Sequence, residues 1–323
     1  MNQSNDYQTS QDNLNALIIW LKRFPSYQIN DLYISGESYG GIYVPYFAYA
    51  IHNYTLNLTG KAEINIKLKG WAVGNACTSP DECVASKILF KNQSSSYAYD
   101  FYWQQGKYSP ELRKDYENTC LKNPSSVDCA NIQGKIIKQI DNEKLNVYDL
   151  YQPCYQQGIP GVPSCTDCVA AFKFFNNDTV KDILHANKDI QWNMCSDKVG
   201  KNYVASLEAS YWIYRTLIPL QKYKILVFSG DTDAAVPITG TRTWIERLRK
   251  EINMPKISPW RPWSYPGKKD NEPQVAGFVE QYVGFTFVTV RGVGHMVPQW
   301  GPSQAEVLIK TYLNGDAWPG LNN

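Results

Sequence analysis

The feature that most constrains how this chain folds is the pentapeptide GESYG at residues 36–40. Residues 31–35 before it are rich in aromatic and β-branched side chains, as in a buried strand, and the mainly apolar residues 42–51 after it are numerous enough for a core helix. Glycines on both sides of a serine, each one residue removed, let a strand turn sharply into a helix with the hydroxyl exposed at the turn. Ser38 is therefore our candidate nucleophile, and an ordinary glycine-serine turn is the alternative.

Further strands and helices alternate along the chain. Residues 11–24 predict an amphipathic helix that Pro25 ends, because leucine and isoleucine recur on one face. The other predicted elements are strands at residues 64–75, 224–230 and 285–291 and helices at residues 176–187, 239–251 and 303–314. This alternation predicts an α/β fold with a mostly parallel sheet flanked by helices, in which the loops after the strands carry the polar candidates.

Residues 77–175 differ in character from the rest of the chain. They hold seven of the eight cysteines, many tyrosines and glutamines, and no clear strand periodicity. We interpret them as a helical, disulfide-containing insertion within a single α/β domain that spans residues 1–323. Such insertions cover the carboxyl edge of a sheet, where substrate pockets and lids are found.

Composition limits the classes of partner that the protein can bind and the cellular compartments in which it can fold. A formal net charge of +2 with dispersed basic residues argues against a nucleic-acid-binding surface, and no apolar run is long enough to span a membrane. Eight cysteines without a zinc-like pattern favour disulfides and an oxidising compartment. Five glycosylation sequons agree, and they begin at Asn2, Asn53, Asn57, Asn92 and Asn177. We expect a glycoprotein of the secretory pathway, either lysosomal, vacuolar or extracellular.

Only three histidines are available as the general base that a serine nucleophile requires. His52 follows the apolar helix beside two sequons, which predicts a surface position, and His185 falls within a predicted helix, which predicts a packing or capping role. His295 follows the strand predicted at residues 285–291 and stands in a Gly-His-Met sequence. The order serine, aspartate, histidine is that of α/β-hydrolase folds, so His295 is our candidate base.

Two aspartates, Asp231 and Asp233, compete for the carboxylate that orients the base. Both directly follow the strand predicted at residues 224–230. Either one could instead cap the helix predicted at residues 239–251. The residues by themselves leave this choice open.

The string GESYGGIYVP at residues 36–45 resembles the nucleophile signature of the serine carboxypeptidases, a family of α/β-hydrolase fold, with Gly40 where alanine is usual. Other strings resemble the family pattern in the same order: Gly74-Asn75, Tyr151-Gln-Pro-Cys154, Phe174-Phe-Asn176, residues 183–187, Trp192-Asn-Met-Cys195, the loop of Asp233 and residues 292–298. The resemblance therefore covers nearly the whole chain. It implies an enzyme that removes residues from the C-terminus of peptides through an acyl-enzyme.

The resemblance also implies roles for individual residues. Asp233 is the triad member and Asp231 supports the loop. Protonated Glu37 helps bind the free carboxylate of the last peptide residue, Tyr39 supplies its backbone N–H to the oxyanion hole, and Met296 lies beside the substrate. An enclosed carboxyl beside another carboxylate has a raised pKa, so we expect activity at acidic pH that is lost as Glu37 ionises. The alternative is that Glu37 only hydrogen-bonds neighbouring backbone.

Cysteine pairing and the start of the chain complete these expectations. The family pattern pairs Cys120 with Cys129 and Cys154 with Cys165, and proximity allows a local bridge between Cys77 and Cys83. In the family, the partner of Cys195 and a second oxyanion donor lie in a glycine-rich segment that has no counterpart in residues 1–35, and Cys168 has no obvious partner. Residues 1–7 show no signal peptide either. We therefore expect an N-terminally truncated sequence without its first strands, and an active full-length enzyme.

The expected partners are peptides or proteins with a free C-terminus. No nucleic acid, membrane, metal or cofactor is expected, and the sequence does not indicate the oligomeric state. One alternative is an acyltransferase on the same scaffold, which forms the same acyl-enzyme but passes the acyl group to an alcohol. A second alternative is a catalytically inactive relative, because the oxyanion segment is absent.

Overall fold

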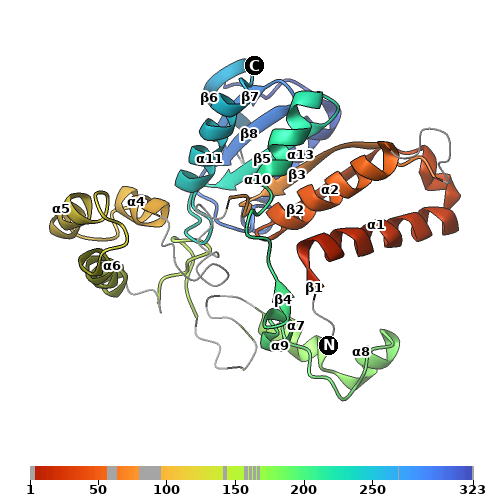
Figure 1. Ribbon diagram of the computed structural model, residues 1–323, viewed down its shortest axis with the longest axis horizontal. Helices are drawn as coiled ribbons and strands as arrows, with labels where there is room; N and C mark the ends of the chain where they lie inside the picture. The colour runs from red at the N-terminus through yellow and green to blue at the C-terminus, as the bar shows by residue number, and fades with distance from the viewer. Residues whose placement is uncertain are drawn as a thin grey trace. The chain divides into compact units, whose positions relative to one another are not determined.

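The computed structural model describes residues 4–56, 64–79, 96–140, 144–155, 159, 162, 165, 168–267 and 269–321. The chain forms two compact units (Figure 1). The sheet unit consists of residues 4–105 and 204–323, and the helical unit contains residues 106–203. No helix within the described ranges is both long and apolar enough to cross a bilayer.

A six-stranded sheet with the order β2-β3-β5-β8-β7-β6 forms the centre of the sheet unit. The first four strands in that order run parallel, whereas β7 is antiparallel to β8 and β6 is antiparallel to β7. In spatial order the strands are β2 (Leu32–Glu37), β3 (Leu68–Gly74), β5 (Lys224–Gly230), β8 (Phe285–Val290), β7 (Pro273–Tyr282) and β6 (Lys256–Pro266). This mostly parallel sheet confirms the predicted α/β class.

Helices cover both faces of this sheet. Ile225 and Val227 of β5 belong to a buried cluster with side chains of α1, α2, α10 and α11, whereas Leu226 and Phe228 belong to a second cluster with side chains of α13. The helical elements of this unit are α1 (Asp6–Arg23), η1 (Pro25–Ile29), α2 (Gly40–Leu56), α4 (Ser96–Gln104), α10 (Tyr211–Leu217), η2 (Ile218–Leu220), α11 (Ile238–Glu251), α12 (Val297–Trp300) and α13 (Pro302–Asn314). Burial on both faces explains why β5, which is buried from Ile225 to Gly230, is an almost uninterrupted apolar run.

The carboxyl ends of the parallel strands lie level with one another. Glu37 of β2 pairs with Gly74 of β3, Gly74 pairs with Phe228 of β5, and Gly230 of β5 pairs with Val290 of β8. The four loops that follow these strands therefore leave the sheet at the same edge. In open α/β sheets this edge is where ligands bind.

The hairpin of β6 and β7 was not predicted from the sequence. Pro259 and Pro262 interrupt the pattern of β6, and its pairing with β7 shifts register at three places. Because each irregularity moves the following side chains to the other face, no regular alternation extends along the strand. Trp263 of β6 is nevertheless fully buried, and its Nε1–H donates to the carbonyl of Thr289 in β8 at 2.9 Å.

The helical unit contains short helices and two disulfides. Its helices are α5 (Pro110–Thr119), α6 (Val127–Ile140), α7 (Val169–Phe175), α8 (Asp178–Ile183) and α9 (Asp197–Gly200), and the two-residue strands of the chain are β1 (Ser4–Asn5) and β4 (Tyr203–Val204). The disulfides Cys120–Cys129 and Cys154–Cys165 confirm the expected pairs. Cys168 and Cys195 are thiols, and Cys83, which is close enough in the sequence for a local bridge to Cys77, lies outside the described residues. The insertion at residues 77–175 stays a prediction.

Candidate active site

Ser38 lies at the sharp turn between β2 and α2. Its φ angle of 60° falls in the left-handed region, which a non-glycine residue rarely adopts. Three backbone hydrogen bonds hold the turn: the Ser38 N–H donates to the Gly74 carbonyl at 3.0 Å, and the Ser38 carbonyl accepts from Gly41 at 2.9 Å and from Cys77 at 3.0 Å. The strained conformation is therefore fixed by neighbouring backbone, as expected of a nucleophile elbow.

Glycine is required on one side of this turn and tolerated on the other. A Cβ atom on Gly36 would lie 2.7 Å from Cγ2 of Val44 in α2, so any larger residue would push helix and strand apart. A Cβ atom on Gly40 would meet no heavy atom of the described residues within 4 Å. The departure from the usual alanine at Gly40 is sterically neutral.

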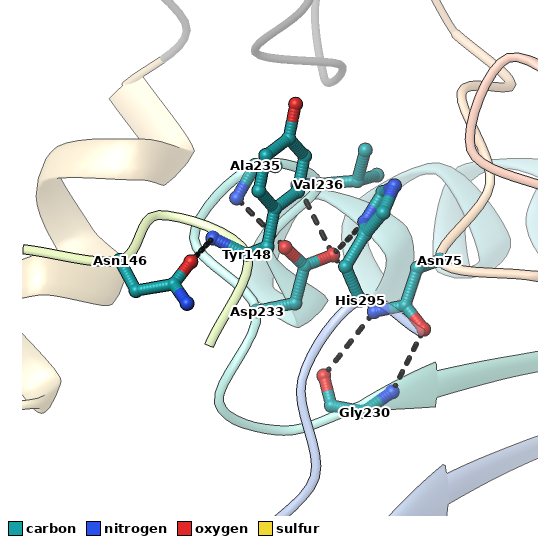
Figure 2. Close-up of polar contacts among 8 residues, drawn as sticks. All are labelled: Asn75, Asn146, Tyr148, Gly230, Asp233, Ala235, Val236 and His295. Carbon is teal, nitrogen blue, oxygen red and sulfur yellow. Dashed lines mark hydrogen bonds and ion pairs between the residues drawn. The ribbon is translucent and has the colours of Figure 1, made fainter. Parts of the chain in front are cut away.

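His295 and Asp233 form a buried pair. His295 Nδ1 lies 2.8 Å from Asp233 Oδ2, and the two residues are 4% and 0% exposed (Figure 2). A carboxylate can only accept hydrogen bonds, so Nδ1 carries the proton and Nε2 of the neutral ring is the proton acceptor. Of the two candidates that the sequence left open, Asp231 and Asp233, it is Asp233 that contacts the histidine.

Asp233 is further held by three donors besides the histidine. Asn75 Nδ2 donates to Oδ2 at 2.8 Å, and the backbone N–H groups of Ala235 and Val236 donate to Oδ1 at 2.8 Å and to Oδ2 at 3.2 Å (Figure 2). Charge-assisted hydrogen bonds of this kind compensate a buried carboxylate for lost hydration. They also fix the orientation of the oxygen that His295 contacts.

Asp231 has a different task. Its Oδ1 accepts from the backbone N–H of Gly292 at 2.7 Å, and so ties the loop after β5 to the loop that carries His295. The capping alternative fails for both aspartates, because the N-cap of α11 is Pro237 and no side chain caps it. Asp231 supports the relative position of the two loops, as the resemblance implied.

Glu37 shares the electrostatic environment of this pair. Its side chain keeps access to solvent, yet the surrounding protein removes enough water to raise the pKa of Glu37; the nearby His295 opposes this rise and Asp233 adds to it. The direction is the one predicted from the sequence. For His295, burial alone would lower the pKa, but the Asp233 and Glu37 carboxylates outweigh burial and raise it.

Tyr39 and Met296 flank the same region. The phenol oxygen of Tyr39 contacts the Asp6 carboxylate, and Met296 is half-buried directly after His295. A groove of about 480 Å³ lies beside the elbow, and its walls include Asn13, Glu37, Ser38, Tyr39, Tyr43 and Phe47. The structure thus places Glu37, Ser38 and Tyr39 along one groove, and His295 and Asp233 at the same sheet edge.

The two other histidines are not placed as predicted. His52 is buried rather than on the surface, because its Nδ1 lies 2.7 Å from the Tyr223 hydroxyl and its ring stacks on Tyr49. His185 lies in an exposed left-handed turn, with φ of 53°, after α8 has ended at Ile183. His295 is the histidine that contacts Asp233.

Sequence reasoning missed two residues near Asp233. Asn75, fully buried, joins β3 to the site by also contacting the Gly230 backbone, its Oδ1 accepting at 3.1 Å and its Nδ2 donating at 3.4 Å. Its position directly after a strand, beside glycine, was the available signal. Tyr102 of α4 lies close enough for the Asp233 charge to act with burial and raise the pKa of Tyr102 to about 12. Nothing in the local sequence of α4 indicated this.

Asn75→Gly should lower kcat about tenfold with little change in KM, since one donor to a charged carboxylate is lost. Glycine keeps the backbone unstrained, because the φ angle at Asn75 is 43°. Kinetics and urea unfolding of the purified variant check this. Asn253→Gly is the matched control, because Asn253 also has a left-handed φ, of 48°, but is exposed. An Asn75→Gly enzyme with lower stability but unchanged kcat would contradict a role through Asp233.

Comparison with known proteins places this geometry in context. The profile of the serine carboxypeptidase family matches residues 1–315. The chain is 34% identical to serine carboxypeptidase 24 of Arabidopsis thaliana over 344 residues, covering 98% of this chain and 68% of the relative. It is 27% identical to the lysosomal protective protein of Mus musculus, covering 98% and 71% of the two chains.

A solved structure shows a related fold. A prohormone-processing carboxypeptidase from Saccharomyces cerevisiae superposes with a TM-score of 0.68 at 21% identity, covering 97% of this chain and 68% of that one. At this identity the likeness concerns the fold, which is the mixed sheet with flanking helices described above.

Proposed function

Because this chain belongs to the serine carboxypeptidase family, we propose that it releases C-terminal residues from peptides through an acyl-enzyme on Ser38. The observation that carries this proposal is the buried contact of 2.8 Å between His295 Nδ1 and Asp233 Oδ2 at the sheet edge where the Ser38 turn also lies. A serine hydroxyl is a weak nucleophile until a base accepts its proton. The three residues supply the nucleophile, the base and the group that orients the base.

The proposed reaction proceeds in two halves. Ser38 Oγ attacks the last peptide carbonyl while His295 Nε2 accepts the serine proton, and Asp233 stabilises the imidazolium that forms. The backbone N–H of Tyr39, which follows the nucleophile, donates to the oxyanion. His295 then gives its proton to the leaving amine, and the C-terminal amino acid departs. Water, activated by the same histidine, releases the shortened peptide from Ser38.

Glu37 accounts for the restriction to C-terminal residues. In its protonated form it donates a hydrogen bond to the free carboxylate of the last residue, and its raised pKa favours that form at acidic pH. An ionised Glu37 would instead repel the carboxylate. The relatives named above include carboxypeptidases. We therefore favour hydrolysis, in which water accepts the acyl group, over an acyltransferase activity, in which an alcohol accepts it.

We extend the proposal to the compartment and the partners. One relative is named a lysosomal protective protein, and two disulfides are present in the helical unit. Disulfides persist in oxidising compartments, which supports the secretory pathway with a lysosomal, vacuolar or extracellular destination. Peptides and proteins with a free C-terminus are the proposed substrates.

A labelling and cleavage experiment tests the proposal. The protein is treated with a fluorophosphonate, and the modified peptide is identified by mass spectrometry; we expect the label on Ser38 and none in a Ser38→Ala variant. In parallel, the release of the amino acid from an N-blocked dipeptide is compared with the release of the amino acid amide from the same dipeptide with an amidated C-terminus. We expect release from the free acid with strong preference. A labelled Ser38 with equal release from both substrates would indicate another serine hydrolase activity, and an unlabelled protein would indicate an inactive relative.

A further inference from the structure

The buried carboxylate of Asp6 contacts the side chain of Tyr39, the residue that follows the nucleophile. Asp6, the first residue of α1, is 2% exposed. Its Oδ1 accepts a hydrogen bond from the Tyr39 hydroxyl at 3.1 Å, and its Oδ2 accepts from the Ser206 backbone N–H at 2.6 Å. One carboxylate therefore joins the start of α1, the elbow and the segment that follows β4.

This arrangement is energetically consistent only if the carboxylate remains paired. An isolated buried carboxylate is costly, whereas two hydrogen bonds and the N-terminal end of an 18-residue helix compensate its charge. The Tyr39 ring also packs edge-on against Tyr43, with ring centroids 4.8 Å apart. Burial, followed by the Asp6 charge, raises the pKa of Tyr39, so its hydroxyl stays a donor over the working pH range. The side chain of Tyr39 is held at its ring and at its hydroxyl.

The position of Tyr39 matters because its backbone N–H is the donor that the elbow directs at the oxyanion. The Ser38 backbone is bonded to Gly74, Gly41 and Cys77, and the Tyr39 carbonyl accepts from the backbone N–H groups of Ile42 at 2.9 Å and Tyr43 at 3.3 Å. These bonds hold the backbone on both sides of Tyr39, and the anchored Tyr39 side chain adds a further restraint at the Cα atom between them. An oxyanion donor acts through preorganisation, so small displacements lower its effect.

We propose that Asp6 is a positioning residue, which holds Tyr39 through its hydroxyl and thereby fixes the backbone N–H that stabilises the oxyanion. This inference rests on the proposed serine hydrolase function and deepens it. Asp6 does not touch the reacting atoms, and its effect reaches them only through Tyr39. The structure thus assigns a catalytic consequence to a contact between α1 and the elbow.

The test removes the hydroxyl and leaves the ring. In Tyr39→Phe we expect kcat for the blocked dipeptide and the rate of fluorophosphonate labelling to fall about five- to tenfold together, because both reactions place an oxygen in the oxyanion site. KM should stay close to that of the parent, whereas the unfolding midpoint should fall, because the buried Asp6 carboxylate loses one of its donors. In an Asp6→Ala background, or in Asp6→Leu if the alanine variant fails to fold, Tyr39→Phe should cause at most a further twofold loss.

Tyr46→Phe is the matched control. Tyr46 lies on α2, and its hydroxyl donates to Ser206 Oγ at 2.9 Å, so this variant removes a tyrosine contact to the same segment without involving the elbow. It should react at the parent rate. Equal rates in Tyr39→Phe and the parent, a loss confined to KM, or losses that multiply in the double variant would overturn the inference alone. A parent that neither cleaves nor reacts with the fluorophosphonate would overturn the proposed function and this inference with it.

Discussion

Asp233→Asn should lower kcat about 10⁴-fold, which is the largest effect that we expect from a change that leaves the nucleophile in place. Oδ2 of Asp233 accepts from His295, Asn75 and Val236, and Oδ1 accepts from Ala235. An amide has a single acceptor oxygen, so the NH₂ group of the substituted side chain would point at one of the N–H donors that the Asp233 carboxylate accepts from. If it faces His295, the ring takes the wrong tautomer; if it faces Ala235, the tautomer is kept but the charge that stabilises the imidazolium is lost.

The pH dependence of Asp233→Asn distinguishes two effects of Asp233, which are the orientation of the His295 ring and the stabilisation of its charged form. The Asp233 carboxylate raises the pKa of His295, and the base is active only when neutral, so activity falls as the pH drops below that pKa. Removing the charge should therefore move the acidic limb of the residual activity to lower pH. The measurement is kcat/KM for a blocked dipeptide from pH 4 to pH 8.

Asp231→Asn is the matched control for this prediction. Its carbonyl oxygen can still accept from the Gly292 N–H, which the Asp231 carboxylate contacts at 2.7 Å. We expect kcat within about threefold of the parent value, because a neutral hydrogen bond replaces a charge-assisted one at a site away from the histidine. An Asp231→Asn enzyme as impaired as Asp233→Asn would show that the two loops, rather than the Asp233 contact, limit the reaction.

Glu37→Gln should remove the rise in KM that we expect of the parent between acidic and neutral pH. As Glu37 ionises, a hydrogen bond to the substrate carboxylate is replaced by repulsion, and a charge-assisted hydrogen bond contributes roughly 1.5–3 kcal/mol, or about 10- to 150-fold in KM. Because its pKa is raised, Glu37 stays protonated to higher pH than an ordinary glutamate, and the rise in KM follows that raised pKa. The glutamine amide donates at every pH, so KM of the variant should stay level.

A second effect of Glu37→Gln concerns the histidine. The Glu37 carboxylate contributes to the raised pKa of His295, so its removal should shift the acidic limb of kcat to lower pH. A dipeptide amide is the substrate control, since it has no carboxylate for Glu37 to bind and its KM should be level with pH in both enzymes. If KM for the free acid depends on pH in Glu37→Gln as it does in the parent, Glu37 does not bind the terminal carboxylate.

The sequence predicted those elements whose signal is local. The GESYG turn lies between a strand and a helix as predicted, with β2 ending at Glu37 and α2 beginning at Gly40. The strand at Lys224–Gly230 was predicted at its observed bounds, because a parallel strand buried on both faces is an uninterrupted apolar run. The β6–β7 hairpin escaped prediction because prolines and register shifts break its alternation.

The contacts of the site depend on tertiary structure, and the sequence could indicate them only in part. His295 could be selected from chain order, but the choice between Asp231 and Asp233 needed a resemblance, since both follow the same strand. The burial of His52 depends on Tyr223, which is distant in the sequence, and no local pattern reports it. Asn75 and Asp6 were missed as parts of the site for the same reason, because their partners lie on other segments.

The level carboxyl ends of β2, β3, β5 and β8 have a kinetic consequence for folding. The groups that these strands bring together, from Glu37 to His295, are spread over most of the chain, so none of their contacts can form by local folding alone. Pairing between distant segments is slow because loop closure costs entropy before the contacts repay it. During refolding, helices should therefore form well before reactivity at Ser38 returns, and the return of fluorophosphonate labelling reports completion of the parallel ladder.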